Sequence, residues 1–332
     1  MPEFRQDPVT GEWIIIADNR ASRPLDFAPR EQPSRKPSDR PCPFCVGNES
    51  KTPSAVATIE NGTASCDWSV RVVPNLYEAV QPDVDFLPFD EHATPSLRNS
   101  TPAWGYHEVI IESPKHVQSL TQIAVENVED VVFAYRQRYR ELSRTDHVKF
   151  VMVFKNCGEK GGISLEHIHS QLVAFHHVPN GILAELSGSL AWLQENNSCV
   201  FCDMVADELE QGERVIMADD HFVAFCPFAS RFPYETWIVP REHSARFEMT
   251  SDQQLQSLAA FYQQVLKRIE LSIPNVAYNC IFHSSPFDSK RYDHYHWHIE
   301  VIPRIATLAG LEIGARTHVN IVKPEQSAKL LR

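Results

Sequence analysis

Residues 155–171 read Lys-Asn-Cys-Gly-Glu-Lys-Gly-Gly-Ile-Ser-Leu-Glu-His-Ile-His-Ser-Gln and follow the apolar run 150–154. The pattern predicts two β-strands joined by a glycine-containing loop. Side chains alternate between the faces of a strand, so we expect His167, His169 and Gln171 to project to one side. Glycines let backbone N–H groups approach an anion closely. Two imidazoles and an amide beside such a loop indicate phosphoryl chemistry, with one histidine as nucleophile or ligand; the alternative is a polar strand edge.

The composition excludes several classes of protein. A chain of 332 residues is long enough for two ordinary domains. Its net charge of −12 argues against a nucleic-acid partner, because proteins that coat nucleic acids carry basic patches. No apolar run approaches the roughly 18 residues of a membrane helix, and the first residues lack the apolar core of a signal peptide. We therefore expect a cytoplasmic protein with no membrane partner.

The two halves of the chain repeat one order of features. Each has a Cys-x-x-Cys pair, a strand followed by a histidine, an amphipathic helix with apolar residues every three or four positions, and a second histidine. His167 follows His116 by 51 residues, and His294 follows His243 by 51. Equal spacing and equal order predict a duplicated unit. We place the boundary between residues 195 and 196 and expect an α+β fold, with a mostly antiparallel sheet and a packed helix in each half.

The cysteine pairs indicate metal binding. In a reducing compartment Cys-x-x-Cys binds a metal or performs redox chemistry rather than forming a structural disulfide. Zinc favours four Cys and His ligands in a tetrahedron, and the histidines of each half complete such sets. We therefore expect about two structural zinc ions per chain, and redox pairs are the alternative. The expected ligands are Cys42, Cys45, His116 and His167 in the first half, and Cys199, Cys202, His243 and His294 in the second.

If His167 binds zinc, His169 is free for chemistry. Neutral imidazole is a good nucleophile near pH 7, and a phosphorus–nitrogen bond to histidine suits onward transfer of a phosphoryl or nucleotidyl group. Gln171 can hydrogen-bond a phosphoryl oxygen without supplying a proton. Asn156, Ser164 and the backbone around Gly162 could hold the remaining oxygens.

Two arginines near the N-terminus are further candidates. Arg20 and Arg23 follow a predicted strand around residues 13–16. Their planar guanidinium groups could bind phosphate oxygens bidentately. The alternative is that they are solvated loop side chains.

These residues together resemble the galactose-1-phosphate uridylyltransferase family of the histidine-triad superfamily, which includes ADP-glucose phosphorylase-like members. The resemblance covers nearly the whole chain and implies two histidine-triad-like domains, 1–195 and 196–332, the first bearing the nucleotidyltransferase site. The motifs are Asp7-Pro-x-Thr-Gly-x-Trp13, Arg20-x-x-Arg23-Pro24, Cys42-x-x-Cys45, Val73-Pro-Asn-x-Tyr77, Ser113-Pro-x-His116, Asn156-x-Gly158, Gly162-x-Ser164 and His167-x-His169-x-Gln171.

The resemblance implies a role for each matching residue. The catalytic nucleophile falls on His169 with Gln171 beside it, and the first zinc site falls on Cys42, Cys45, His116 and His167. The positions that bind nucleotide or sugar phosphate are Arg20, Arg23, Asn75, Asn156, Gly162, Ser164, Gln171 and, in the C-terminal segment, Glu312. The implied assembly is a homodimer with active sites near the subunit interface.

The implied reaction is a ping-pong exchange through a nucleotidyl-histidine. UDP-glucose and a hexose 1-phosphate, as in galactose metabolism, are the expected substrates. ADP-glucose with inorganic phosphate is the alternative, because Ala306 and Leu311 replace a lysine and a tyrosine of the classical pattern. A non-catalytic zinc-stabilised nucleotide-binding protein is the other alternative. A histidine-triad hydrolase is disfavoured, because Gln171 stands where those hydrolases carry another histidine.

Two further departures from the family pattern concern histidines. The usual His-Pro-His reads His167-Ile168-His169 here. In some members of the family a different second metal site is matched by Glu185, His283, His296 and His298. We favour the cysteine-containing set as the second site, because thiolates bind zinc strongly.

Overall fold

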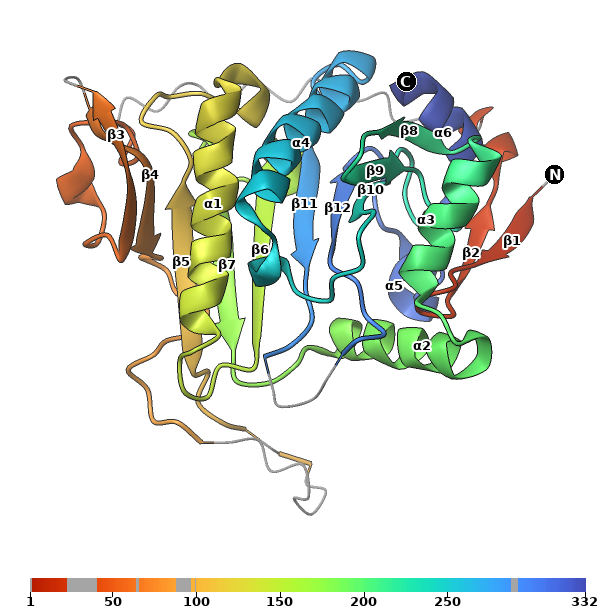
Figure 1. Ribbon diagram of the computed structural model, residues 1–332, viewed down its shortest axis with the longest axis horizontal. Coiled ribbons are helices and arrows are strands. Elements are labelled where there is room, and N and C mark those ends of the chain that lie inside the picture. The colour runs from red at the N-terminus through yellow and green to blue at the C-terminus, as the bar shows by residue number, and fades with distance from the viewer. Residues whose placement is uncertain (1, 23–40, 64–65, 88–96, 99, 288–291) are drawn as a thin grey trace.

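The computed structural model describes residues 2–22, 41–63, 66–87, 97–98, 100–287 and 292–332. It confirms the expected α+β class, with a long antiparallel sheet, two helices on one of its faces and a small separate sheet (Figure 1). The strands are β1 (Glu3–Gln6), β2 (Trp13–Ile16), β3 (Ala57–Thr63), β4 (Cys66–Pro74), β5 (Gly105–Ile111), β6 (Phe150–Cys157), β7 (His169–Phe175), β8 (Val215–Ala218), β9 (Phe222–Phe225), β10 (Thr236–Pro240), β11 (Tyr278–His283), β12 (His298–Pro303) and β13 (Val319–Asn320). The α-helices are α1 (Val125–Leu142), α2 (Asn180–Asn196), α3 (Val200–Gln211), α4 (Asp252–Ser272), α5 (Gly310–Ala315) and α6 (Pro324–Leu331), and short 3-10 helices span Asp18–Ser22, Glu49–Lys51, Leu120–Gln122, Glu159–Gly161 and Phe247–Met249.

The order of strands in the long sheet confirms the duplication. The order is β3-β4-β5-β7-β6-β11-β12-β10-β9-β8. Read inward from either edge it is the same, with β3 to β7 of the first half matched by β8 to β12 of the second. The halves join where β6 pairs with β11, and there Phe154 lies opposite Ile281 and Asn156 opposite Asn279. One sheet therefore runs through both halves of the molecule. The division of the chain into two domains between residues 195 and 196 stays a prediction.

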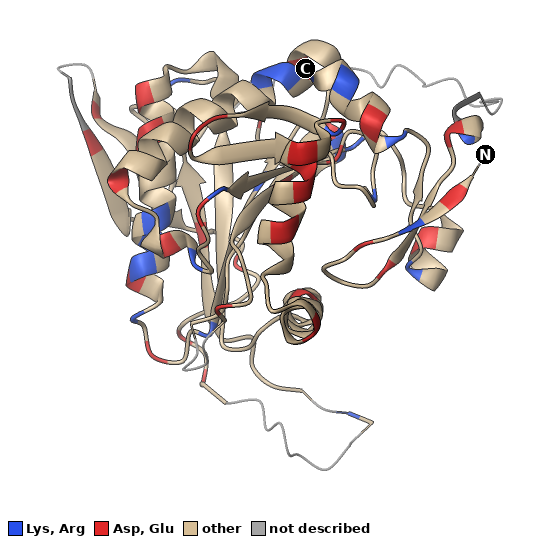
Figure 2. Ribbon diagram, turned by 45° about the vertical axis from the view of Figure 1, so that its right-hand side comes forward, with Lys and Arg blue, Asp and Glu red and all other residues tan. Residues whose placement is uncertain are grey.

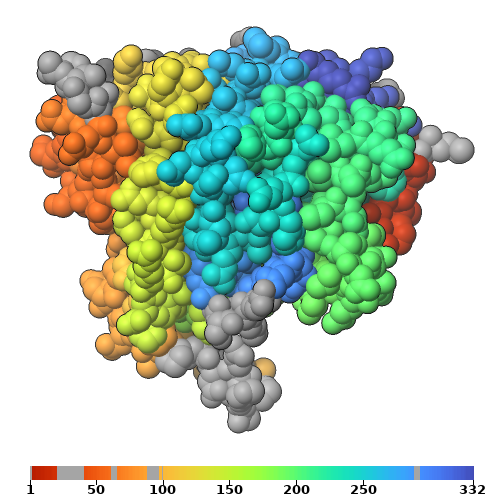
Figure 3. Space-filling view, in the orientation of Figure 1, coloured from red at the N-terminus to blue at the C-terminus, as the bar shows by residue number. Residues whose placement is uncertain are grey.

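Helices α1 and α4 cover one face of this sheet (Figure 1), and they lie side by side at the surface of the molecule (Figure 3). Each buries the apolar stripe that its periodicity predicts. The expected capping box begins α4: the Ser251 side chain accepts from the Gln254 N–H, and the Gln254 side chain accepts from the Ser251 N–H. Arg136 of α1 donates to the carbonyl of Thr250 at 2.6 Å and to the carboxylate of Asp252 at 2.5 Å, and the second bond joins the two helices. The opposite face packs against α2 and α3 in the second half of the molecule and also carries the functional groups described below.

The small sheet joins the two ends of the chain. Its order is β1-β2-β13, and β13 pairs in parallel with β2. Asn320 of β13 donates to the carbonyl of Ser230 at 3.0 Å, which attaches this sheet to the loop before β10. The residues that follow β2, including Arg20, therefore lie with the C-terminal half of the molecule.

Acidic residues outnumber basic ones, 43 to 31. Along the ribbon in Figure 2, the positions of Lys and Arg are interspersed with those of Asp and Glu. Within the described ranges, the helices are either too short or too polar to cross a bilayer.

Candidate active site and metal centres

The first Cys/His group assembles as predicted from Cys42, Cys45, His116 and His167, whose ligand atoms all lie within 4.8 Å of one another. Cys45 Sγ lies 3.4 Å from His116 Nδ1 and 3.6 Å from His167 Nδ1, and Cys42 Sγ lies 3.5 Å from His167 Nδ1. Zinc bonds of about 2.3 Å to sulfur and about 2.05 Å to nitrogen give a tetrahedron with S–N edges of about 3.6 Å. The four side chains therefore fit a zinc ion without rearrangement.

His167 is prepared for this role by its other nitrogen. Its Nε2 lies 2.8 Å from the carbonyl oxygen of Ser113. A carbonyl only accepts, so Nε2 carries the proton and Nδ1 presents its lone pair to the thiols. Burial lowers the pKa of His167 to about 4, which keeps the ring neutral, as a metal ligand must be.

The second group contains Cys199, Cys202 and His243 as predicted, but its fourth member is His296. The prediction of His294 was wrong. Cys202 Sγ lies 3.3 Å from His243 Nδ1 and 3.6 Å from His296 Nδ1, whereas His294 meets this group only through its backbone carbonyl, 3.5 Å from Cys199 Sγ. The strand positions explain the difference, because His296 stands two residues before β12 just as His167 stands two residues before β7.

A third group shows that the two alternative ligand sets of the second half are separate. Glu185, His283 and His298 gather around one point, with ligand atoms within 4.8 Å of one another, while His296 belongs to the cysteine group. Glu185 lies 3.2 Å from His283 Nδ1. Although burial opposes it, Glu185 and Glu300 raise the pKa of His283 to about 10. Within this group, the positive charge of His283 therefore compensates the negative charge of Glu185.

His169, the predicted nucleophile, lies outside all three groups and is 6% exposed. Its Nδ1 is 2.7 Å from the carbonyl oxygen of His167 and must donate the proton, so Nε2 carries the lone pair. Burial lowers the pKa of His169, which favours the neutral, nucleophilic ring. Phe44, between the two cysteines of the first group, packs against His169 with ring centroids 5.3 Å apart. The Cys/His group that holds Cys42 and Cys45 in place therefore also positions Phe44 against the ring of His169.

The second half holds the matching histidine in a closed environment. His298 begins β12 as His169 begins β7, and its Nδ1 lies 3.0 Å from the carbonyl of His296. Its ring stacks between Trp237 and His283, with centroids 4.9 and 4.5 Å away, and it is 1% exposed. His298 therefore has the same backbone contact as His169, but its ring is enclosed by neighbouring rings.

Gln171 is oriented by a residue that sequence reasoning missed. The Ala79 N–H donates to His107 Nδ1 at 3.0 Å, so the proton of His107 is on Nε2, which donates to Gln171 Oε1 at 2.9 Å. The amide nitrogen of Gln171 is then left as the donor. Asn75 Nδ2, the amide nitrogen of a predicted substrate residue, lies 3.0 Å from His107 Nε2, but both atoms are donors in this tautomer and so do not bond to each other. The alternation of side chains along β5 could have indicated that His107 lies on one face of the sheet. Placing it beside Gln171 also requires the β5–β7 register, in which His107 pairs with Val173.

The loop between β6 and β7 needs its glycines for two reasons. Gly162 has φ +88°, the left-handed region that favours glycine. Gly158 has φ +72°, and a Cβ there would lie 2.8 Å from Ala277 Cβ. The loop packs closely against the residue that precedes β11, and Gly162 and Ser164 are exposed.

Asn156, another predicted substrate residue, lies on the open face of the sheet. Its Oδ1 accepts from Asn279 Nδ2 at 2.7 Å, so its own amide nitrogen remains a donor. Both asparagines line a cavity of about 490 Å³ together with Arg231 and Arg304. Glu185 and Glu300 also line this cavity, and Arg231 is already paired with Glu300 at 2.6 Å. Arg304 and the amide donors are therefore the groups in it that suit an anionic, hydroxyl-rich ligand.

Arg20 and Glu312 lie elsewhere. Arg20 follows β2 in the small sheet. Backbone N–H groups at the start of α5 lower the pKa of Glu312, and the charges of His318 and Arg20 contribute less. The small sheet is attached near β10, four strand spacings or about 19 Å from β7 (Figure 1). One chain therefore does not bring these two residues to His169. Arg23 lies outside the described residues.

A duplicated α+β sheet with two Cys/His groups and a metal-free, neutral histidine is the architecture of a histidine-dependent group-transfer enzyme. The family model "Galactose-1-phosphate uridyl transferase, N-terminal domain" matches residues 1–179, and "Domain of unknown function (DUF4921)" matches residues 105–331. The chain therefore belongs to the galactose-1-phosphate uridylyltransferase family of nucleotidyltransferases.

Individual relatives match over the full length. The chain is 31% identical over 335 residues to ADP-glucose phosphorylase of Arabidopsis thaliana, covering 100% of this chain and 92% of that protein. It is 28% identical to galactose-1-phosphate uridylyltransferase of Thermotoga maritima, covering 100% and 98%. The crystal structure of an Arabidopsis thaliana ADP-glucose phosphorylase with bound ADP-glucose matches with a TM-score of 0.85 at 30% identity, covering 100% of this chain and 99% of that one. A structure of uridylyltransferase matches with a TM-score of 0.74 at 26% identity, covering 100% and 97%.

Proposed function

We propose that this protein moves an adenylyl group from ADP-glucose to inorganic phosphate through a covalent bond to His169. His169 Nε2 attacks the α-phosphorus, the bond from that phosphorus to the bridging oxygen breaks, and glucose 1-phosphate leaves. A phosphate oxygen then attacks the same phosphorus, the phosphorus–nitrogen bond breaks, and ADP is released. The His169 ring, neutral and with its proton on Nδ1, carries this proposal.

The residues around His169 supply the remaining requirements. The amide nitrogen of Gln171 can donate to a nonbridging oxygen of the α-phosphate, because His107 occupies its Oε1. Asn156 can donate to the sugar or its phosphate from the open face. Neither amide can take a proton from water, so neither activates water as a nucleophile, which favours transfer over hydrolysis.

Adenine is preferred over uracil on two observations. The full-length match at 31% identity is to an ADP-glucose phosphorylase. The C-terminal segment also carries Ala306 and Leu311 at positions where the classical uridylyltransferase pattern has a lysine and a tyrosine. The second candidate, uridylyl exchange between UDP-glucose and a hexose 1-phosphate, uses the same His169 and is favoured by the match to the Thermotoga enzyme.

Labelling of the protein separates the two substrates. The enzyme is incubated with ADP-glucose or UDP-glucose carrying radioactive α-phosphorus, quenched, and freed of nucleotide. We expect label from ADP-glucose, its loss in His169→Asn, and its discharge as ADP on addition of phosphate. His298→Asn is the matched control, because it removes the equivalent but covered ring. Label from UDP-glucose that only a hexose 1-phosphate discharges would support the second candidate, and no label from either would refute both.

We further propose that a second copy of the chain supplies Arg20 and Glu312 to the site of His169. Arg20 follows β2 of the small sheet, at the far side of its own subunit from His169, and its charge contributes to the lowered pKa of Glu312. Helix α5, which carries Glu312, also exposes Leu311 by 49% and Ile313 by 72%, which suits an interface. The proposed assembly is a homodimer with two composite sites.

Mixing two inactive variants tests the composite site. His169→Asn and Glu312→Gln chains are each assayed alone and then after joint unfolding and refolding. Random pairing makes half of the dimers mixed, and each mixed dimer has one intact site, so about a quarter of the wild-type activity should return. No recovery, despite dimers in light scattering, would show that His169 and Glu312 act within one subunit or not together.

Bound zinc would have a structural role in this enzyme. Cys42, Cys45, His116 and His167 would hold one ion, and Cys199, Cys202, His243 and His296 the other. Four protein ligands leave no open position for substrate, so the ions would stabilise the loops that carry the site.

A further inference from the structure

A closed network of buried polar groups lies directly behind His169, on the helix-facing side of the sheet. Lys155 Nζ donates to Glu112 Oε2 and, at 3.3 Å, to the carbonyl oxygen of His169. Glu112 Oε1 accepts from the hydroxyls of Tyr135 and Ser170, which are themselves 2.6 Å apart. All four side chains are at most 2% exposed.

The second half of the molecule provides an internal comparison for this network. Gln171 lies opposite Phe154 in the β6–β7 register, and Glu300 lies opposite Ile281 in the β11–β12 register. Since Gln171 and Glu300 each stand two residues after the matching histidines, the two registers set the halves in correspondence. The equivalents of Lys155 and Ser170 in the second half are then Phe282 and Ile299 respectively.

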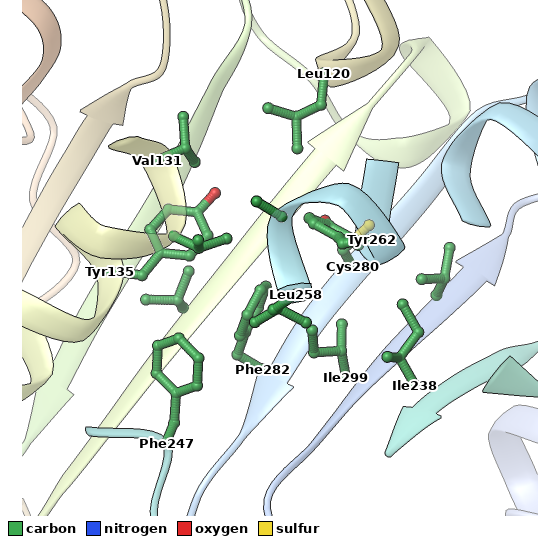
Figure 4. Packing of buried hydrophobic residues seen from close by; sticks show 14 of the residues in the cluster. Leu120, Val131, Tyr135, Ile238, Phe247, Leu258, Tyr262, Cys280, Phe282 and Ile299 are labelled. Carbon is green, nitrogen blue, oxygen red and sulfur yellow. The ribbon is translucent and has the colours of Figure 1, made fainter. Parts of the chain in front are cut away.

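The equivalent of Glu112 follows in the same way. Ser170 lies opposite Ile110 in β5, and Ile299 lies opposite Ile238 in β10. Two residues further along, Glu112 therefore corresponds to the buried Pro240. Figure 4 shows the resulting apolar layer of the second half, in which Ile238, Phe282 and Ile299 pack beneath α4.

The fold thus accepts an apolar layer at this position, yet the first half keeps a buried charged pair there. Taking an ammonium and a carboxylate out of water costs free energy, and replacing such a pair by well-packed apolar residues is often neutral or stabilising. The half that contains His298 has apolar residues at the equivalent positions. Only the half with the proposed nucleophile retains the charges, so packing alone does not account for them.

We propose that Lys155 and Glu112 are positioning residues for His169, an inference that rests on the proposed function. Lys155 holds the carbonyl of His169, and Glu112 holds the side chain of the next residue, Ser170. The backbone on both sides of the His169 ring is thereby fixed, while the Nδ1–H bond to His167 fixes its rotation. Together these contacts keep Nε2 in line with the α-phosphorus without touching the substrate.

The test separates positioning from stability. Lys155→Met, Lys155→Arg and Glu112→Gln are compared with Ile299→Ala, which disturbs the equivalent layer of the second half. For each full-length protein we measure the melting temperature, the zinc content, the Kd for ADP-glucose, and the single-turnover rate at which radioactive α-phosphorus reaches the protein.

We expect Lys155→Met and Glu112→Gln to slow labelling on the order of tenfold to a hundredfold, the loss typical of a misplaced reacting group, with Kd changed less than about threefold. Lys155→Arg, which keeps a donor, should recover part of the rate. Ile299→Ala should lower the melting temperature and leave the labelling rate within about twofold.

Three results would overturn the proposal. Labelling of Lys155→Met and Glu112→Gln at the wild-type rate would show that the pair does not position His169. A slowing in proportion to the fall in melting temperature, shared by Ile299→Ala, would show a structural role alone. A wild-type protein that never acquires label would instead refute the proposed function and remove the basis for this inference. If Lys155→Met does not fold, the near-isosteric Glu112→Gln decides.

Discussion

The identity of the fourth ligand in the second Cys/His group can be tested with two alanine variants. His296 Nδ1 lies 3.6 Å from Cys202 Sγ, close to the edge length of a zinc tetrahedron, whereas His294 offers only its backbone carbonyl. His296→Ala should therefore destroy the site, and His294→Ala should leave its four ligand atoms in place.

The magnitude follows from linkage. A zinc ion present at a thousand times its Kd stabilises the folded chain by about 4 kcal/mol. A chain of this size shifts its melting temperature by about 2 °C per kcal/mol, so loss of the second site should lower it by about 8 °C. His294 is buried but holds no ion in this account, so its replacement should cost about 1 kcal/mol, as a typical point substitution does, and shift the melting temperature by about 2 °C.

Elemental analysis of zinc per chain, with calorimetry on the same samples, is the assay. Wild type and His294→Ala should hold about two zinc ions, and His296→Ala about one. A chelator should then lower the melting temperature of His296→Ala by less than that of wild type, because one site has already gone. Loss of zinc from His294→Ala, with two ions retained in His296→Ala, would refute the assignment made from the geometry.

Other consequences can be checked separately. Gln171→Leu removes the amide donor and should lower kcat by on the order of a hundredfold with little change in the melting temperature; a change confined to KM would contradict the role given to the donor. His107→Phe frees the side chain of Gln171 and should lower kcat by roughly tenfold, and a variant with wild-type kcat would show that this orientation is unimportant. Gly158→Ala forces a Cβ to 2.8 Å from that of a neighbouring alanine at φ +72°, and should lower the free energy of unfolding by about 2 kcal/mol in urea titrations, whereas Gly314→Ala, with open space around it, should change it little. Burial raises the pKa of Glu208 from 4.5 to about 7. The stability that Glu208 contributes is therefore complete below pH 4.5 and is lost as the pH rises through about 7, by up to about 3 kcal/mol. Glu208→Gln should flatten the pH dependence of the unfolding free energy over that range, and an unchanged slope would contradict this prediction.

The sequence was sufficient where local pattern determines structure. The alternation of His167, His169 and Gln171 placed the two β7 side chains on one face, because strand geometry alone dictates this. The three-and-four spacing of apolar residues predicted both α1 and α4, and the capping residues of α4 were recognisable as such. The first Cys/His group followed from its motif and from the order of its histidines.

Spacing failed where the two halves differ in loop length. Equal intervals of 51 residues selected His294, yet the strand positions of the halves match at His167 and His296, 53 residues after His243. The additional two residues lie in the connection before β12. A count along the chain cannot detect such an insertion, whereas the register of the strands does.

Contacts between distant segments were the other limit. His107 and the Lys155–Glu112 pair acquire their roles only through the pairing of β5, β6 and β7, which no local pattern specifies. The place of Arg20 and Glu312 relative to His169 depends on the attachment of the small sheet and, in our proposal, on a second copy of the chain. These are tertiary and quaternary properties, and the motifs give residue types without their arrangement.

The most direct test of the account is to locate the covalent nucleotide. Protein quenched during turnover of ADP-glucose is digested under alkaline conditions, which preserve phosphorus–nitrogen bonds to histidine, and the peptides are sequenced by mass spectrometry. The account predicts one adenylyl group, carried by His169. An adduct on another residue, or full turnover with no adduct at any time point, would contradict it.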